Sequence, residues 1–75
     1  SLAKRIEKAS NLLALGDFRA VSTLKKLKGS VTDPELRAII LNNLGYYYFM
    51  KGKYEIAENH FLNSINSHPS PFAKY

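Results

Sequence analysis

The chain has 75 residues, of which 45% are hydrophobic and 23% charged, and this composition excludes an intrinsically disordered protein. It has no cysteine, which excludes disulfide bonds and thiolate metal sites and leaves the redox compartment open. No apolar run approaches the roughly 18 residues of a membrane span, and the N-terminus lacks the pattern of a signal peptide. We therefore expect one small soluble domain over residues 1–75, with the cytoplasm as the default compartment.

The net charge of +5 belongs to the first part of the chain. Residues 1–28 hold seven Lys and Arg against two Asp and Glu, whereas residues 29–75 hold four against four. Such a cluster would suit phosphates or an anionic membrane surface. We expect no aromatic stacking partner within it, and lysines at helix ends are usually solvated, so nucleic acid is a less favoured partner. The candidate electrostatic patch comprises Lys4, Arg5, Lys8, Lys25, Lys26 and Lys28.

Apolar spacing predicts two helices at the start of the chain. Apolar residues at intervals of three and four predict an amphipathic helix over residues 2–15 that ends at Gly16. A second helix is predicted from about Asp17 to Lys28, because its apolar residues recur at every third position. Lysines in its last turn offset the helix dipole, and we expect Gly29 to end it.

Two further helices are predicted in the second half. Asp33 is suited to cap a helix and Pro34 to occupy its first position, so a third helix is expected from Pro34 to about Lys51. Its apolar residues cover most of its circumference, which indicates burial on more than one side. After a turn over residues 51–53, a fourth helix is expected over residues 54–67.

The two halves share a turn motif. Gly16-x-Phe18-x-x-Val21 and Gly52-x-Tyr54-x-x-Ala57 have the same spacing, and their glycines lie 36 residues apart. This relation predicts two helical hairpins, over residues 2–33 and 34–69.

A longer motif runs through the second hairpin: Leu41-x-x-Leu44-Gly45-x-x-Tyr48, then Gly52-x-Tyr54-x-x-Ala57-x-x-x-Phe61, then Pro69. Over residues 38–71 it resembles the tetratricopeptide repeat (TPR), with Leu41 at the position that is usually Trp and Ser64 where a second Ala is common. The first hairpin is a degenerate copy, because Arg5, Lys8 and Ala9 take the places of Leu41, Leu44 and Gly45. The resemblance implies an all-α fold in which four helices form antiparallel hairpins stacked as a short right-handed α-solenoid.

The last residues suggest a further unit. Tyr75 falls 34 residues after Leu41, and Ser70-Pro71 resembles a helix cap and first helical position. Residues 70–75 therefore match the start of a third repeat, and a short tail is equally compatible with them.

The motif residues themselves are expected to serve packing. Gly45 and Ala57 are small enough to let the two helices of the hairpin approach closely, and Leu44, Tyr48 and Phe61 are expected to fill the space between them.

Function is expected on the residues that the motif omits. The resemblance implies that a partner binds on the concave surface, which the first helix of each repeat lines. Asparagines there could hydrogen-bond an extended backbone, and methionine adapts to varied partners. The alternative is that Ile39, Phe49 and Met50 pack against the neighbouring hairpin. The candidate partner-binding residues are Ile39, Asn42, Asn43, Tyr46, Phe49 and Met50.

One binding mode of TPR relatives is not expected here. Some of them grip a C-terminal carboxylate with cationic and amide side chains spread over three repeats. Asn43 matches one amide, but Ile6 and Ser10 stand where the cation and the amide of the first repeat would be.

Catalysis finds little support in the sequence. His60 and His68 are the only histidines, and Glu58 and His60 are two residues apart on a helix, so their side chains diverge. We expect His60 to be exposed, and we expect no catalytic residue, metal or cofactor.

The sequence therefore predicts a non-catalytic protein–protein interaction module, or scaffold, that binds a partner peptide or helix on its concave surface. The alternative is an assembly element that forms homo-oligomers through exposed repeat ends, because at least three repeats are usually needed to bury a continuous core. This chain has two repeats, and Phe72 and Tyr75 follow them in the sequence. A basic nucleic-acid-binding helical domain is the least favoured of the three.

Overall fold

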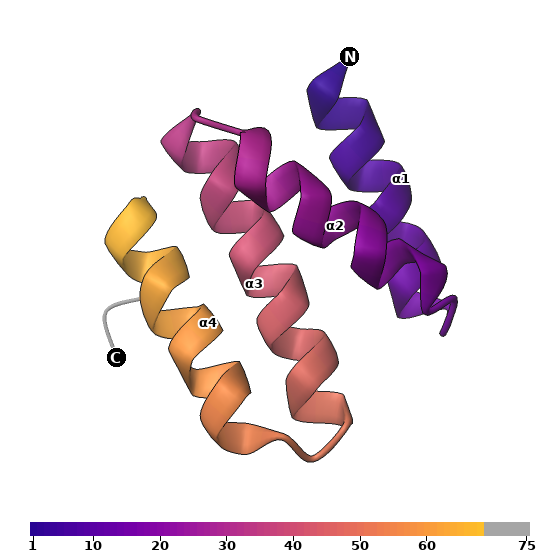
Figure 1. The fold of residues 1–75 in the computed structure, drawn as a ribbon, viewed down its shortest axis with the longest axis vertical. Helices are drawn as coiled ribbons and strands as arrows, with labels where there is room; N and C mark the ends of the chain where they lie inside the picture. Colours follow the sequence, from indigo (N-terminus) through magenta and orange to yellow (C-terminus); the bar gives the residue numbers. More distant parts are fainter. Residues whose placement is uncertain (69–75) are drawn as a thin grey trace.

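The computed structural model describes residues 1–68 and has four α-helices and no strand within them. The helices are α1 (Leu2–Ala14), α2 (Arg19–Ser30), α3 (Pro34–Met50) and α4 (Tyr54–Ser67). They follow one another as two helical hairpins, α1–α2 and α3–α4, and α3 contacts the other three helices (Figure 1). None of these four helices is long and apolar enough to cross a membrane. The predicted all-α class is confirmed.

The predicted start of a third repeat lies outside the described residues. This concerns residues 70–75, including Phe72 and Tyr75, together with Pro69 of the motif.

The starts of α3 and α4 lie where the sequence predicted them, and α1 has a cap that was not predicted. The Ser1 hydroxyl accepts a hydrogen bond from the Lys4 backbone N–H at the start of α1. The Asp33 carboxylate accepts one from the Leu36 N–H at 3.0 Å, with Pro34 in the first turn of α3. These caps satisfy backbone donors that a helix leaves unpaired. The fourth helix spans residues 54–67, as predicted.

The predicted end of the second helix at Gly29 is wrong. Helix α2 continues through Gly29 to Ser30 and ends where Val31 adopts an extended conformation, with φ −83° and ψ 123°. Val31 is buried in the core, so the chain leaves the helix at the residue whose side chain must turn inward. Gly29 has a helical backbone with a φ that is not positive, and no heavy atom lies within 4 Å of a Cβ built on it.

The two hairpin turns have the same backbone hydrogen bonds. Gly16 and Gly52 both have positive φ, +87° and +77°. In the first turn the N–H groups of Gly16 and Asp17 donate to the carbonyls of Leu13 and Leu12, at 2.9 and 3.0 Å. In the second turn the N–H groups of residues 52 and 53 donate to the carbonyls of residues 49 and 48, at 3.0 and 2.9 Å. Each donor and acceptor of the second turn lies 36 residues after its counterpart in the first turn. The relation between the two halves that the sequence suggested is therefore present in the backbone.

The hydrophobic core lies between the first hairpin and α3. The buried residues of this cluster come from α1, α2, the α2–α3 connection and α3: Ile6, Ala9, Ala20, Leu24, Leu27, Val31, Ile40 and Leu44. The first hairpin thus covers one side of α3, and α4 covers another. The expectation that the third helix is buried on more than one side is confirmed.

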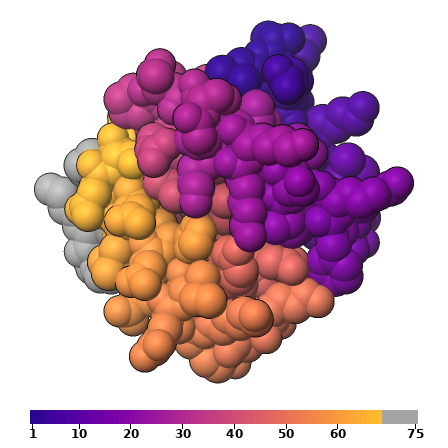
Figure 2. All heavy atoms as spheres, viewed as in Figure 1, coloured from indigo at the N-terminus to yellow at the C-terminus, as the bar shows by residue number. Residues whose placement is uncertain are grey.

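Helices α3 and α4 approach closely because residue 45 is a glycine, which has no side chain. A Cβ built on Gly45 would lie 2.8 Å from two ring carbons of Phe61, closer than real Cβ contacts come. Ala57 is buried opposite, and the Ser64 hydroxyl donates to the Ala38 carbonyl at 2.7 Å. The serine that departs from the repeat pattern therefore joins the two helices by a hydrogen bond. In the space-filling view, side chains of α2 and α4 cover much of α3 on the face shown (Figure 2).

Candidate functional site

One face of α3 carries exposed apolar side chains. The exposed fraction is 42% for Ile39, 61% for Tyr46, 52% for Phe49 and 67% for Met50. Asn42 is also exposed, and Asn43 is half-buried. Large side chains with this exposure are not packed in the core, so the alternative in which Ile39, Phe49 and Met50 serve the neighbouring hairpin is disfavoured.

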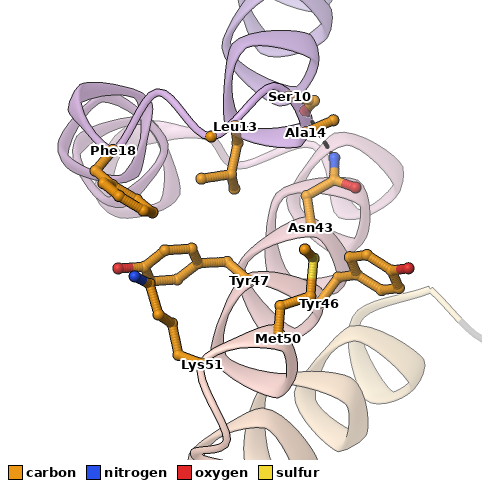
Figure 3. A pocket seen from close by; sticks show the side chains of 10 residues that line it. Ser10, Leu13, Ala14, Phe18, Asn43, Tyr46, Tyr47, Met50 and Lys51 are labelled. Atoms are coloured by element: carbon orange, nitrogen blue, oxygen red, sulfur yellow. Dashed lines mark hydrogen bonds between the residues drawn. The ribbon is translucent and has the colours of Figure 1, made fainter.

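Part of this face borders a cavity of about 270 Å3 between α1 and the C-terminal half of α3 (Figure 3). Leu13 of α1 and Phe18 of the turn stand opposite Tyr47 and Met50 of α3. Most of its surface is therefore apolar. The lining residues are Ser10, Leu13, Ala14, Gly16, Phe18, Asn43, Tyr46, Tyr47, Met50 and Lys51.

A hydrogen-bonded pair closes one end of the cavity. The Asn43 amide donates to the Ser10 hydroxyl at 2.7 Å, and that hydroxyl donates to the Ile6 carbonyl, also at 2.7 Å (Figure 3). The pair joins α3 to α1. Asn43 therefore has a structural role, and its amide oxygen, an acceptor, takes no part in this pair.

Only half of the predicted partner-binding residues border the cavity. Asn43, Tyr46 and Met50 do so, at the spacing of one helical stripe that faces α1. Ile39, Asn42 and Phe49 lie outside the lining, and the ring of Phe49 packs against Tyr54 at the start of α4, with centroids 5.4 Å apart.

Sequence reasoning missed two residues of the turns, Phe18 and Lys51, and Tyr47 of α3. Phe18, Tyr47 and Lys51 all line the cavity, and the Lys51 ammonium lies 3.9 Å from the centroid of the Phe18 ring. The repeated Gly-x-aromatic motif could have placed Phe18 beside the end of a helix. Its contact with Lys51 depends on how the hairpins pack, which no local pattern contains.

A row of aromatic rings runs from the first turn to α4. The ring centroids are 5.9 Å apart for Phe18 and Tyr47, 5.2 Å for Tyr47 and Tyr48, and 5.0 Å for Tyr48 and His60. His60 is therefore half-buried against a tyrosine, and the expectation that it is exposed is wrong.

Lysines flank this row. The Lys25 ammonium lies 5.7 Å from the Tyr48 ring centroid, and a hydrogen bond with Tyr48 raises the pKa of Lys25 above its ordinary value of 10.5. Lys25 and Lys26 line an open hollow between α2 and α3 together with Phe18, Val21, Ser22 and Tyr47. The expectation that the basic cluster has no aromatic neighbour is therefore wrong, because α3 supplies tyrosines from a distant part of the sequence.

The six predicted cations are divided among different places. Arg5 and Lys8 line a hollow between α1 and α2, and Lys4 and Lys8 line another along α1. Neither of these contains Lys25 or Lys26. Lys28 is half-buried, and its backbone carbonyl accepts a hydrogen bond from the Arg37 guanidinium.

Among the residues that the structure describes, the one ion pair joins Asp17 of the first turn to Arg19 at the start of α2. The Arg19 guanidinium donates to both carboxylate oxygens of Asp17 at 3.0 Å, and these bonds lower the pKa of Asp17 below its ordinary value. Across residues 1–68, no three His, Cys, Asp or Glu side chains gather to hold a metal ion.

The chain matches no protein-family model, no curated protein and no solved structure. Its function must therefore be argued from the surfaces described above.

Proposed function

We propose that this chain is a protein-interaction module of the tetratricopeptide type, which binds a partner peptide or helix in the groove between α1 and α3 without catalysing a reaction. The observation that carries the proposal is the apolar cavity beside the exposed Tyr46 and Met50. The two turns have equivalent hydrogen bonds 36 residues apart in the sequence, which supports the repeat assignment.

The size of the cavity favours a peptide side chain as its occupant. Sites for whole small ligands typically measure roughly 300–1,000 Å3 and enclose most of the ligand. A cavity of about 270 Å3 that is open on one side fits one or two side chains of a longer chain lying along the groove.

The chemistry of the groove also suits a peptide. Tyrosine and methionine provide apolar contact area, and aromatic residues dominate the energetics of many interfaces. The amide oxygen of Asn43 can accept a hydrogen bond from a peptide N–H, while its amide nitrogen stays on Ser10.

The proposal is tested by selecting ligands from a displayed library of random peptides and measuring their affinity by fluorescence anisotropy. Tyr46→Ala and Met50→Ala should each weaken binding about fivefold or more, as expected for truncation of contact residues at an interface. Both side chains are mostly exposed, so circular dichroism spectra and melting temperatures should stay unchanged.

Leu15→Ala is the matched control. Leu15 is 84% exposed and lies outside the cavity lining, so its truncation should leave binding intact. A library that yields no ligand, or ligands that ignore Tyr46→Ala and Met50→Ala, would refute the proposed groove.

A second candidate function is assembly through the outer side of the second hairpin. Phe49 and Tyr54 contact each other, yet more than half of each side chain is exposed. Exposed aromatic pairs of this kind are typical of interfaces.

Light scattering over a range of concentrations tests this candidate. Assembly predicts a mass above 8.5 kDa that rises with concentration and is lowered by Phe49→Ser. A monomer at every concentration excludes it.

A further inference from the structure

The hollow between α2 and α3 combines positive charge with an exposed phenylalanine ring and half-buried tyrosine rings. We define the lysine–aromatic surface as the residues Phe18, Ser22, Lys25, Lys26, Tyr47, Tyr48 and Lys51. Its cations come from α2 and from the end of α3, and its rings come from the first turn and α3.

Three neighbouring rings lie between two cations on this surface. Lys51 lies on the Phe18 ring, Phe18 contacts Tyr47, Tyr47 contacts Tyr48, and Lys25 lies over Tyr48 at the other end. Aromatic rings and cations side by side are the two features that bind a single nucleic acid strand, because bases stack on rings and phosphates pair with cations.

Acidic side chains that would repel an anion do not line the part of this hollow that the structure describes. The hollow as described within residues 1–68 is lined by two lysines and by no carboxylate. The nearest acidic residue in sequence, Asp17, is bonded to Arg19 through both carboxylate oxygens. Lys25 and Lys26 are exposed, and exposed lysines carry a full positive charge at neutral pH.

We propose that the lysine–aromatic surface binds single-stranded nucleic acid, with a base stacked on Phe18 and phosphates bound by Lys25, Lys26 and Lys51. The Phe18 side chain is 55% exposed and can offer its ring to a base. Stacking of a base on an aromatic ring is generally stronger than a solvent-exposed cation–π contact, so a base can displace Lys51 from Phe18 and release its ammonium for a phosphate. The Ser22 hydroxyl lies in the same hollow and can donate to phosphate oxygen.

A single strand fits better than a duplex or an acidic peptide. A duplex hides its base faces, which leaves the rings without a stacking partner. An acidic peptide could pair with the lysines but would leave Phe18 unused. The proposed ligand uses both features of the surface.

This inference goes beyond the proposed peptide groove and does not depend on it. Phe18 and Tyr47 border both the groove and the hollow, and Lys51 lines the groove and contacts Phe18. Lys25 and Lys26 border only the hollow, and Tyr46 and Met50 border only the groove. Variants at these last four residues therefore separate the two functions.

The experiment measures anisotropy of a labelled oligothymidylate of about twelve nucleotides as the salt concentration is raised. Each phosphate contact on a single strand contributes about −0.7 to the slope of log K against log salt, so three lysines predict a slope of about −2. The absence of salt-dependent binding at the lowest salt overturns the proposal.

Lys25→Ala/Lys26→Ala should weaken binding about tenfold and reduce the slope by about 1.4, because two phosphate contacts are lost. The control is Lys4→Ala/Lys8→Ala, which removes the same charge from α1 and should have at most a slight effect. An equal loss in the two double variants means diffuse attraction to a basic protein and overturns the proposed site.

Phe18→Leu tests the stacking contact. It should weaken binding about fivefold or more with no change in slope, since no phosphate contact is lost. The circular dichroism spectrum of the variant should match that of the parent chain, which would show that the variant is folded. An abasic oligomer or polyglutamate that competes as well as oligothymidylate shows that the rings contribute nothing, and this too overturns the proposal. So does binding to phosphatidylserine vesicles without binding to the oligonucleotide.

Discussion

The two hairpins have the same turns but are held together differently. In the first hairpin, α1 and α2 bury apolar side chains that also cover α3, so its cohesion comes from a core shared with the second hairpin. In the second hairpin, α4 adds one fully buried residue, Ala57, and its contact with α3 depends on close backbone approach at Gly45.

This difference separates the TPR-like motif from the candidate binding surfaces. The second hairpin carries the TPR-like motif, whose small residues serve the α3–α4 contact. The first hairpin has Ala9 and Val21 in the places of Gly45 and Ala57 and carries a cluster of cations, and its turn and helices provide one wall of the groove and of the lysine–aromatic surface. Both candidate binding surfaces lie where the degenerate hairpin meets the well-matched one.

The strongest test of the shared core is Leu44→Ala. Leu44 is fully buried between the hairpins, and such truncations cost about 2–5 kcal/mol, comparable to the entire stability of many domains this small. We expect a largely unfolded chain by circular dichroism. The exposed Leu15→Ala should melt like the parent, and similar melting of both variants would contradict the core assignment.

Gly45→Ala tests the close approach in the second hairpin. The new Cβ would collide with the Phe61 ring, and overpacking of this kind costs about 1–3 kcal/mol, against a helix-propensity gain of at most about 1 kcal/mol. Urea denaturation should therefore show a net loss. In a Phe61→Leu background the same substitution should cost less, and an identical cost in both backgrounds would show that the ring is not the obstacle.

The equivalence of the two turns is tested by Gly16→Ala and Gly52→Ala. Both glycines have positive φ, and an L side chain in that conformation costs about 1–2 kcal/mol. We expect both variants to lose stability by similar amounts in thermal melts. A marked difference between them would indicate that the turns are equivalent in backbone geometry but not in energy.

Gly29→Ala should have a smaller effect of opposite sign. Gly29 is helical and no heavy atom lies within 4 Å of a Cβ built on it, so alanine should stabilise α2 by about 0.5–1 kcal/mol. A raised melting temperature is the expected result. A lowered one would mean that the helix ends at Gly29 in solution, as the sequence alone suggested.

The smallest expected effect is a loss of folding stability at acidic pH. Bonds from Arg19 lower the pKa of Asp17 in the folded state, so its contribution to stability is present above the ordinary pKa of 3.8 and is lost as the pH falls through the lowered value. The equivalent position in the second turn is Lys53, so only the first turn should show the effect.

Carboxyl carbon shifts measured by NMR against pH check this prediction. Asp17 should titrate below 3.8 in the parent chain and rise towards that value in Arg19→Ala. Titration at the ordinary value in both proteins would show that the ion pair does not form in solution.

Much of the local structure could be predicted from particular residues. Asp33 and Pro34 fixed the start of α3, and the spacing of Gly16 and Gly52 revealed the repeated turn, because capping and turn geometry depend on a few neighbouring side chains. The end predicted at Gly29 was wrong, since a glycine ends a helix only where the following chain must leave it. Here Val31 determined that point by its burial.

The candidate sites were predictable only in part. Asn43, Tyr46 and Met50 were identified because helical periodicity placed them on one stripe of α3. Phe18, Tyr47 and Lys51 were missed, because their contacts join residues about 30 positions apart and arise from packing between hairpins.

The sequence by itself determined the four helices, their turns and the relation between the two halves, because these follow from periodicity, caps and glycines that act within a few residues. Only the tertiary structure decided which apolar residues of α3 stay exposed, that Asn43 bonds to Ser10, and that lysines of α2 meet aromatic rings. Those outcomes depend on how the first hairpin lies against α3, and the buried core that fixes this arrangement is built from side chains distributed along the whole described chain.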